Sequence, residues 1–244
     1  IMRYLITIEY NGKNYCGWQY QNNALSVQQV IEDTMFEFLK QKVKLVASGR
    51  TDKGVHAYGQ KAHFDINTNF PMNKLPIAIN NILPDDIRIK DISKVDDDFH
   101  AQYSAKRKTY IYKFYISKIE SPIRKDTHAR IIPPLDFELM KQGAKLFLGK
   151  HDFKAFSSTG SSIKTTTRTI YKLDLQKKND EITMEIEGDG FLYNMVRIIA
   201  GTLVWLAKKK LTLSDIMEAM DTQNRKKGGK TFPAHALYLK DVLY

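Results

Sequence analysis

The segment ASGRTDKGVHAYGQKAHFDI (residues 47–66) decides how the first part of the chain folds. Its second half, from Gln60 to Ile66, alternates apolar and polar residues, which is typical of a β-strand. A second strand-like run, from Val43 to Val46, precedes it. The segment therefore predicts two strands joined by a loop that carries Asp52.

Two interpretations of Asp52 are open from this loop alone. An aspartate between glycines is usually a turn former, because its side chain accepts hydrogen bonds from nearby backbone N–H groups. The alternative is a carboxylate placed to react with a substrate. Arg50 favours this alternative, since a guanidinium is of little use in a tight turn but binds a phosphate or a base edge well.

The patterns on either side of this segment predict an α+β fold. The first hundred residues show the order strand, helix, strand, loop, strand, helix, and later residues repeat a similar order. The expected strands are 2–10, 109–116, 170–175, 182–186 and 235–244, of which 170–175 and 182–186 form a hairpin. The expected helices are 26–39, which begins with the capping box Ser26–Gln29, then 72–82, 136–147, 191–207 and one that begins at the N-cap Ser214.

The repeated order predicts two related lobes with mixed or antiparallel sheets flanked by helices. We place the N-terminal lobe at residues 1–100, with the Asp52 loop, and the C-terminal lobe at residues 101–244, with Tyr110 and Arg197.

Composition indicates a globular protein with a polyanionic partner. The chain of 244 residues is 43% hydrophobic and has a formal net charge of +11. Its cations occur in bursts, which favours nucleic acid over a membrane surface as the partner. The bursts are Lys106-Arg107-Lys108, Lys208-Lys209-Lys210 and Arg225-Lys226-Lys227 with Lys230.

Several other classes of site find no support. Gly49 and Gly54 have the spacing of a Walker A loop, but Val55-His56 stands where that loop needs Lys and Ser or Thr. The six histidines lack the spacing of a metal site, and the single cysteine, Cys16, forms no intrachain disulfide. No apolar run reaches the roughly 20 residues that cross a bilayer. We therefore expect no cofactor, no metal, no membrane and a cytoplasmic location.

Arg197 lies in the middle of the apolar helix expected at 191–207. No acidic residue occurs between Asp189 and Asp215, so the helix itself offers no carboxylate partner. A buried guanidinium needs an oxygen partner. We expect a carboxylate or phosphate from elsewhere, with Asp52 as a candidate, while the alternative is an Arg197 that caps backbone carbonyls or reaches the surface.

The residues along the chain resemble those of the tRNA pseudouridine synthase A family. GRTDKGVHA (49–57) matches the family signature around the catalytic aspartate. Five further matches occur in the same order as in the family. They are YNGKNYCGWQYQ (10–21), FHAQYSAKRKTYIY (99–112), HDFKAFSSTG (151–160), DGFLYNMVRIIAGTL (189–203) and PAHALYLKDVLY (233–244).

This resemblance implies a pseudouridine synthase fold with a cleft between two lobes, and a homodimer that shares one tRNA. The implied enzyme is an isomerase that converts uridine to pseudouridine in the anticodon stem-loop, at positions 38 to 40 of the tRNA, without a metal or organic cofactor. The target base is flipped out of the stack before it reacts.

The resemblance also assigns roles to residues. Asp52 is implied to be the nucleophile, Arg50 to hold the flipped nucleotide, Tyr110 to pack against the target base, and Arg197 to pair with Asp52. The aspartate either adds to the base or removes a C2′ proton to give a glycal, and the sequence leaves both routes open. We also expect contacts with nucleic acid from Lys53, His56, Lys106, Lys108, Lys227 and Lys230.

Two departures from the family pattern bear on substrate choice. Gln102 stands where an arginine is common, and Lys53 replaces a small residue beside the nucleophile. Two rival functions are an inert RNA-binding module and a metal-dependent nuclease, for which the acidic run at 96–98 is the sole candidate cluster.

Overall fold

The computed structural model describes residues 1–160 and 163–244, which form two compact units. These residues contain ten β-strands and five α-helices, so the expected α+β class is confirmed. Unit 1 comprises residues 1–106 together with 238–244, and unit 2 comprises residues 107–237.

The last strand, β10 (Leu237–Leu243), belongs mainly to unit 1, whereas chain order assigns it to the expected C-terminal lobe. It pairs in parallel with β3, with Tyr238 opposite His56. A parallel partner needs no connecting turn, so nothing local in the sequence shows which strand a terminal segment joins.

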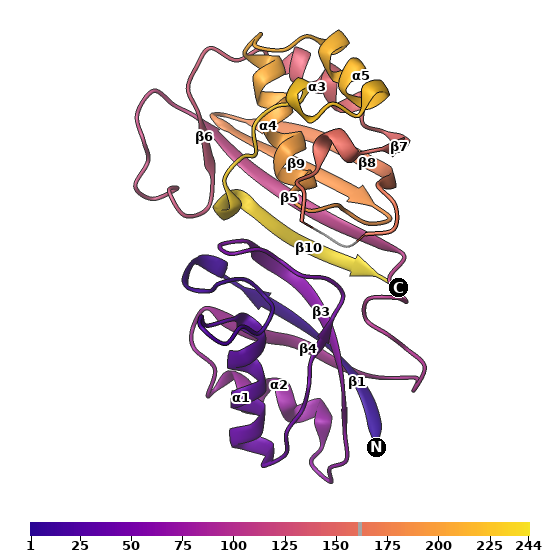
Figure 1. Ribbon diagram of the computed structural model, residues 1–244. Helices are drawn as coiled ribbons and strands as arrows, with labels where there is room; N and C mark the ends of the chain where they lie inside the picture. The colour runs from indigo at the N-terminus through magenta and orange to yellow at the C-terminus, as the bar shows by residue number, and fades with distance from the viewer. Residues whose placement is uncertain (161–162) are drawn as a thin grey trace. The chain divides into compact units, whose positions relative to one another are not determined.

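Unit 1 contains a sheet in the order β4-β1-β3-β10 (Figure 1). Its central strand β1 (Met2–Tyr10) is antiparallel to β3 (His56–Ile66) on one side and to β4 (Ile87–Val95) on the other. Alternate side chains of β1, such as Ile6 and Ile8, are buried, as the alternation in the sequence predicts.

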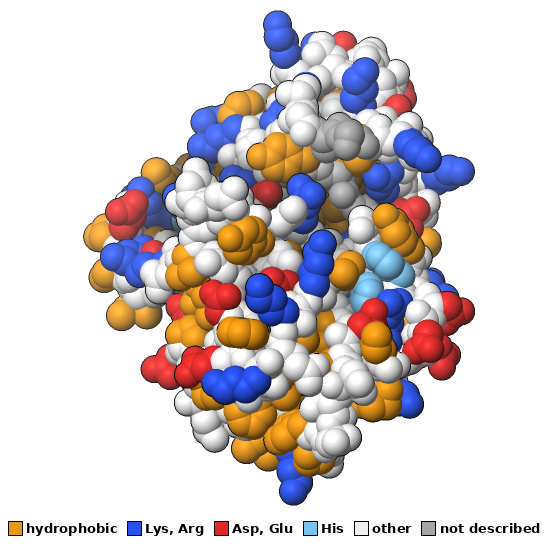
Figure 2. All heavy atoms as spheres, turned by 60° about the horizontal axis from the view of Figure 1, so that its bottom comes forward, with side chains coloured by type: hydrophobic (Ala, Val, Ile, Leu, Met, Phe, Trp, Pro, Cys, Tyr) orange, Lys and Arg blue, Asp and Glu red, His pale blue; other side chains and the backbone are white. Residues whose placement is uncertain are grey.

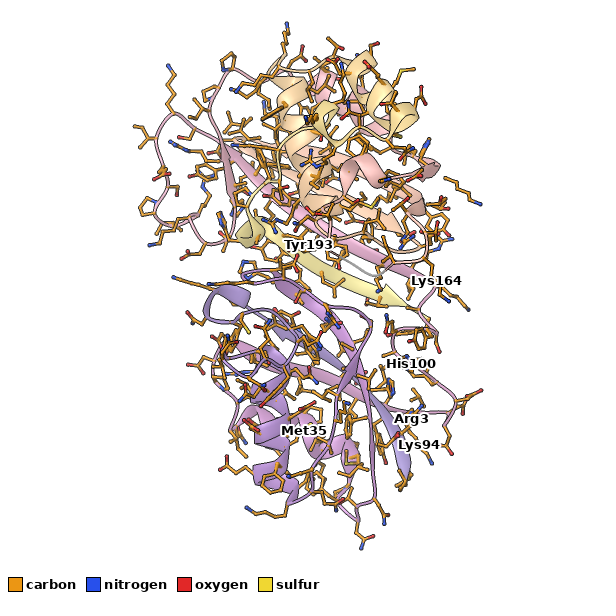
Figure 3. The ribbon with its side chains drawn as sticks, in the orientation of Figure 1. Arg3, Met35, Lys94, His100, Lys164 and Tyr193 are labelled. Carbon is orange, nitrogen blue, oxygen red and sulfur yellow. The ribbon has the colours of Figure 1, made fainter. Side chains whose placement is uncertain are left out.

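Two helices lie beside each other against this sheet (Figure 1). α1 (Val27–Leu39) begins where the Ser26 side chain accepts a hydrogen bond from the Gln29 backbone N–H, so the predicted N-cap is confirmed. α2 (Leu75–Asn80) follows a 3-10 turn at Met72–Lys74. Met35, labelled in Figure 3, is buried on α1 and contributes to the core of this unit.

The strand expected at Val43–Val46 is much shorter than predicted. Only Val46–Ala47 (β2) pairs with β3. The backbone N–H of Leu45 donates instead to the Glu32 carboxylate at 2.8 Å, and its carbonyl accepts from the Gln28 amide at 3.2 Å. Side chains of α1 therefore take the hydrogen bonds that a longer strand would make.

The strands of unit 2 pair in the order β5-β9-β8-β7, all antiparallel, and β6 is parallel to β5. These strands are β5 (Arg107–Ile116), β6 (Ala129–Ile131), β7 (Gly149–Asp152), β8 (Thr167–Lys178) and β9 (Glu181–Gly188). The predicted hairpin is confirmed: Lys178 lies opposite Glu181, and Asn179 in the turn has a φ of 55°.

The helices of unit 2 are α3 (Phe137–Lys145), α4 (Met195–Ala207) and α5 (Leu213–Thr222). α4 begins four residues later than the sequence predicts, because Asn194 adopts the left-handed conformation with a φ of 59°. The predicted N-cap Ser214 is also wrong. Thr212 and Asp215 exchange hydrogen bonds in a complete capping box, so the helix begins two residues earlier.

The core of unit 2 lies between α4 and one face of β5. Tyr112 and Phe114 on this face are fully buried, and both rings contact Phe232. Among the described residues, no helix is both long and apolar enough to cross a membrane.

Candidate active site

In unit 1, backbone hydrogen bonds hold the Asp52 loop. Gly17 and Asp52 form an antiparallel bridge, and the Trp18 N–H donates to the Thr51 carbonyl at 3.0 Å. Gly17 has a φ of 112°, and a Cβ atom there would lie 2.5 Å from the Thr51 carbonyl oxygen. Only glycine therefore allows this close approach.

The segment that holds the loop is itself attached to α1 and to the turn before β4. The Val27 N–H donates to the Gly17 carbonyl at 3.1 Å, so the first turn of α1 binds the same glycine. On the other side, the Tyr15 hydroxyl donates to the Asp86 carboxylate at 2.5 Å. This hydrogen bond and the burial of the ring raise the pKa of Tyr15, with burial as the larger cause.

Beneath the loop lies a buried hydrogen bond between Tyr10 and Thr51. Their hydroxyl oxygens are 2.6 Å apart, and the two residues are 3% and 6% exposed. Burial raises the pKa of Tyr10 to about 12, so the phenol stays neutral at physiological pH. Thr51 is thus held by a side-chain hydrogen bond to Tyr10 as well as by the backbone hydrogen bond from Trp18.

Sequence reasoning missed these supporting residues. Tyr10, Tyr15 and Gly17 all fall within the matched segment YNGKNYCGWQYQ (10–21), which was the available signal. Asp86 carries no such signal, because its role depends on a contact across 71 residues of sequence.

The loop exposes the predicted residues to different degrees. Asp52 is half-buried, while Arg50 and Lys53 on either side are exposed. His56 is 3% exposed: its Nδ1 accepts a hydrogen bond from the Gly12 N–H at 2.9 Å, and its ring packs 4.7 Å from that of Tyr238. We therefore assign His56 a supporting role in unit 1, in place of the direct contact with nucleic acid that the sequence suggested.

In unit 2, Tyr110 lies on β5 opposite Ile186. Its ring meets that of Phe191 edge to face, with the centroids 5.1 Å apart. Phe191 belongs to the turn before α4, which also contains Tyr193, labelled in Figure 3. The edge-to-face contact fixes the plane of the Tyr110 ring.

Arg197 is half-buried on α4 and has two oxygen partners in its own unit. Its Nε donates to the Phe232 carbonyl at 2.7 Å, and a terminal nitrogen donates to the Asn194 side-chain oxygen at 2.9 Å. The alternative in which Arg197 binds a backbone carbonyl is therefore realised in part. Neither oxygen carries a formal charge, and the Arg197–Asp52 pair stays a prediction.

The segment 225–232 lies directly on α4. A Cβ atom at Gly201 would come within 1.8 Å of the Lys230 carbonyl oxygen, so the space beside this glycine is filled by backbone. The Phe232 N–H donates to the Arg197 carbonyl at 3.1 Å, and the Gly229 N–H donates to the Thr202 hydroxyl at 2.9 Å. This segment therefore positions the backbone partner of Arg197.

The predicted basic residues differ in exposure and in their partners. Lys106 and Lys230 are exposed, Lys227 forms an ion pair of 3.4 Å with Glu218, and Lys108 is half-buried on β5. Lys and Arg side chains are spread over the face drawn in Figure 2, among acidic and hydrophobic ones. Within the described part of the chain, no group of three or more His, Cys, Asp or Glu side chains is placed to hold a metal ion.

A sequence model of tRNA pseudouridine synthase matches residues 6–104 and 144–244. The chain belongs to the tRNA pseudouridine synthase family.

The relatives are similar over nearly their whole length. The chain is 44% identical over 240 residues to tRNA pseudouridine synthase A of Thermoanaerobacter sp. (strain X514), and the match covers 98% of both chains. It is 46% identical over 239 residues to tRNA pseudouridine synthase A of Acetivibrio thermocellus, again with 98% of both chains covered.

Proposed function

We propose that this protein isomerises uridine to pseudouridine in the anticodon arm of tRNA, with Asp52 as the nucleophile. The observation that carries the proposal is the hydrogen-bonded loop in which the half-buried Asp52 lies between the exposed cations Arg50 and Lys53. The names of the relatives and the net charge of +11 support a polyanionic tRNA substrate.

The reaction is an internal rearrangement of one nucleotide. The N1–C1′ bond breaks, the uracil rotates, C5 bonds to C1′, and the C5 proton leaves while N1 gains a proton. Atoms and electrons balance without a redox partner. Asp52 assists by adding to the base or by removing the C2′ proton to give a glycal, and either role requires an ionised carboxylate.

The other predicted residues bind the reacting nucleotide. Flipping the target base out of the stack costs a few kcal/mol. Stacking on an aromatic side chain returns about 1–3 kcal/mol per base, and we assign this contact to Tyr110. Arg50 is exposed beside the nucleophile and suits the vacated position in the RNA stack or a neighbouring phosphate. Arg197 keeps Asp52 ionised when the two groups pair.

Three finer expectations belong to the same proposal. The modified uridines lie at positions 38 to 40 of the tRNA, the protein acts as a homodimer that shares one tRNA, and it acts in the cytoplasm. The first two follow from the resemblance to the family, and the third from the composition of the chain.

The test uses tRNA transcripts that carry tritium at C5 of uridine. Pseudouridine formation releases this tritium to water. We expect release by the wild type and none by Asp52→Asn, because an amide neither adds to the base nor removes a proton. Asp97→Asn, which changes an exposed acid of the same unit, is the matched control and should release tritium at the wild-type rate.

The rival functions give different results in this assay. An inert RNA-binding module retains tRNA on a filter but releases no tritium, and a metal-dependent nuclease shortens the RNA and stops when a chelator is added. Release that is unchanged in Asp52→Asn would refute the nucleophile assignment while leaving the activity itself in place.

A further inference from the structure

Lys108 and Tyr110 lie on the same face of β5, because they are two residues apart on the strand. Lys108 pairs with Gly188 of β9, and Gly188 pairs with Ile170 of β8. Lys108, Gly188 and Ile170 thus lie side by side on three neighbouring strands, and Gly188 leaves a gap in this cross-strand row because it has no side chain. Tyr110 lies in the next row on the same face.

Phe191 covers this bare position. A Cβ atom at Gly188 would lie 3.2 Å from Cζ of Phe191, and the same ring meets Tyr110 edge to face. Lys108 and the two aromatic rings are therefore neighbours on one face of the sheet in unit 2.

Arg168 lies on β8 two residues before Ile170, so it is on the same face of the sheet, in the neighbouring row opposite His151. Its guanidinium donates to the carbonyls of Thr165 and Thr167 at 2.9 and 2.7 Å, so its own loop holds it in place. A Cβ atom at Gly190 would lie 3.4 Å from the Arg168 Nε, which places the guanidinium beside the turn that carries Phe191.

The carboxylate in this turn, Asp189, already has a backbone donor. Its Oδ1 accepts a hydrogen bond from the Thr169 N–H at 2.9 Å. Burial lowers the pKa of Lys108, and the positive charge of Arg168 lowers it further. The two cations are thus near enough to repel each other, and an anion bound between them would stabilise both.

We propose that Lys108 and Arg168 form a phosphate-binding subsite for the nucleotide whose base contacts Tyr110. The inference rests on the proposed function and adds Arg168, which the sequence did not indicate, to the residues that bind RNA. A phosphate suits the site better than a base, because two cations bind an anion strongly. The aromatic rings of Tyr110 and Phe191 beside them can then contact the base.

The experiment compares Lys108→Gln and Arg168→Gln with the wild type in tritium release from C5-labelled RNA. The substrates are synthetic anticodon-arm hairpins, with or without a neutral methylphosphonate at the phosphates on either side of the modified uridine. KM and kcat are measured from low to moderate salt. Arg107→Gln is the matched control, because this neighbour is on the opposite face of β5, paired with Glu187 at 2.8 Å.

We expect each Gln variant to raise KM about tenfold and to reduce the slope of log(kcat/KM) against log salt by about one. For the wild type, a methylphosphonate at one of the two positions should raise KM about tenfold. For the Gln variants, the same substitution should raise KM no further. Arg107→Gln should retain the full methylphosphonate effect.

Charge-preserving variants separate phosphate binding from a structural role. Lys108→Arg and Arg168→Lys keep the charge, but the latter loses the two carbonyl contacts of Arg168. Recovery of KM in both supports the subsite, whereas an Arg168→Lys that is as weak as Arg168→Gln assigns Arg168 to loop structure and overturns the proposal.

The remaining outcomes are also decisive. A methylphosphonate effect that persists undiminished in the Gln variants overturns the subsite while the activity stands. A wild type that releases no tritium from any RNA contradicts the proposed function instead. If the Gln variants melt early, the Lys and Arg exchanges and the methylphosphonate effect on the wild type decide the question.

Discussion

Gly201→Ala tests whether the close contact between α4 and the segment 225–232 holds the arginine of the candidate site. The new Cβ atom would lie 1.8 Å from the Lys230 carbonyl oxygen and 2.9 Å from Cδ1 of Phe232. Because a carbon approaches a carbonyl oxygen to about 3.3 Å, the segment must move by roughly 1.5 Å. That movement lengthens the 2.7 Å hydrogen bond from Arg197 Nε to the Phe232 carbonyl beyond bonding distance.

Two costs add in this variant. Overpacking costs about 1–3 kcal/mol, and each hydrogen bond that is lost between the helix and the segment costs about 1 kcal/mol. We take about 3 kcal/mol as the expected loss in the free energy of unfolding. For a chain of this length, 1 kcal/mol shifts the melting temperature by about 2–4 °C, so Gly201→Ala should melt about 6–12 °C below the wild type.

Gly228→Ala is the matched control, because it adds the same methyl group to the segment 225–232 that packs on α4. Its nearest neighbours would be 3.4 Å away, an ordinary contact, and its φ of −83° suits alanine. Thermal melts followed by circular dichroism should place this variant within about 2 °C of the wild type. A Gly201→Ala variant that melts with the wild type, or equal shifts in the two variants, would refute the reasoning.

Two further predictions concern unit 1. Thr51→Val removes one partner of the buried hydrogen bond to Tyr10 and should lower the free energy of unfolding by about 1–3 kcal/mol in urea titrations. Arg3 binds both carboxylate oxygens of Asp65, at 2.7 and 2.8 Å, and this lowers the pKa of Asp65. Arg3→Gln should therefore destabilise the protein at neutral pH. In thermal melts, the difference in melting temperature between this variant and the wild type should become smaller as the pH falls.

The sign of the pH effect follows from the depressed pKa. The ion pair stabilises the fold while Asp65 is ionised, that is above the ordinary aspartate pKa of 3.8, and this stability is lost as the pH falls through the lower folded value. A difference in melting temperature between wild type and Arg3→Gln that stays constant into strong acid would contradict this reasoning.

Thr183→Val, on a half-exposed strand position, is the control for Thr51→Val and should change stability by less than about 0.5 kcal/mol.

Periodicity predicted most of the elements, and it failed where side chains compete for backbone hydrogen bonds. The alternation in β1 and β5 and the hairpin of β8 and β9 follow from local sequence, because each depends on which face of a strand is buried. The strand at 43–46 was wrong, since Gln28 and Glu32 of α1 bind the backbone of Leu45. No pattern within the strand itself reports such a contact.

In the candidate site, too, some features follow from the sequence and others only from the structure. The sequence alone determined the class of fold, the basic charge and the family, because these depend on residue type and on order along the chain. It also predicted Asp52, Arg50, Tyr110 and Arg197 as the site residues. The structure added Tyr10, Tyr15 and Asp86 beneath and beside the Asp52 loop.

Only the tertiary structure decided that His56 is a buried support, that Gly201 admits the backbone of Lys230, and that Arg168 lies near Lys108. Each of these depends on a close approach between residues that are 29, 44 or 60 positions apart in the chain. Packing of the two units' own sheets and helices sets such distances, and residue type and spacing do not.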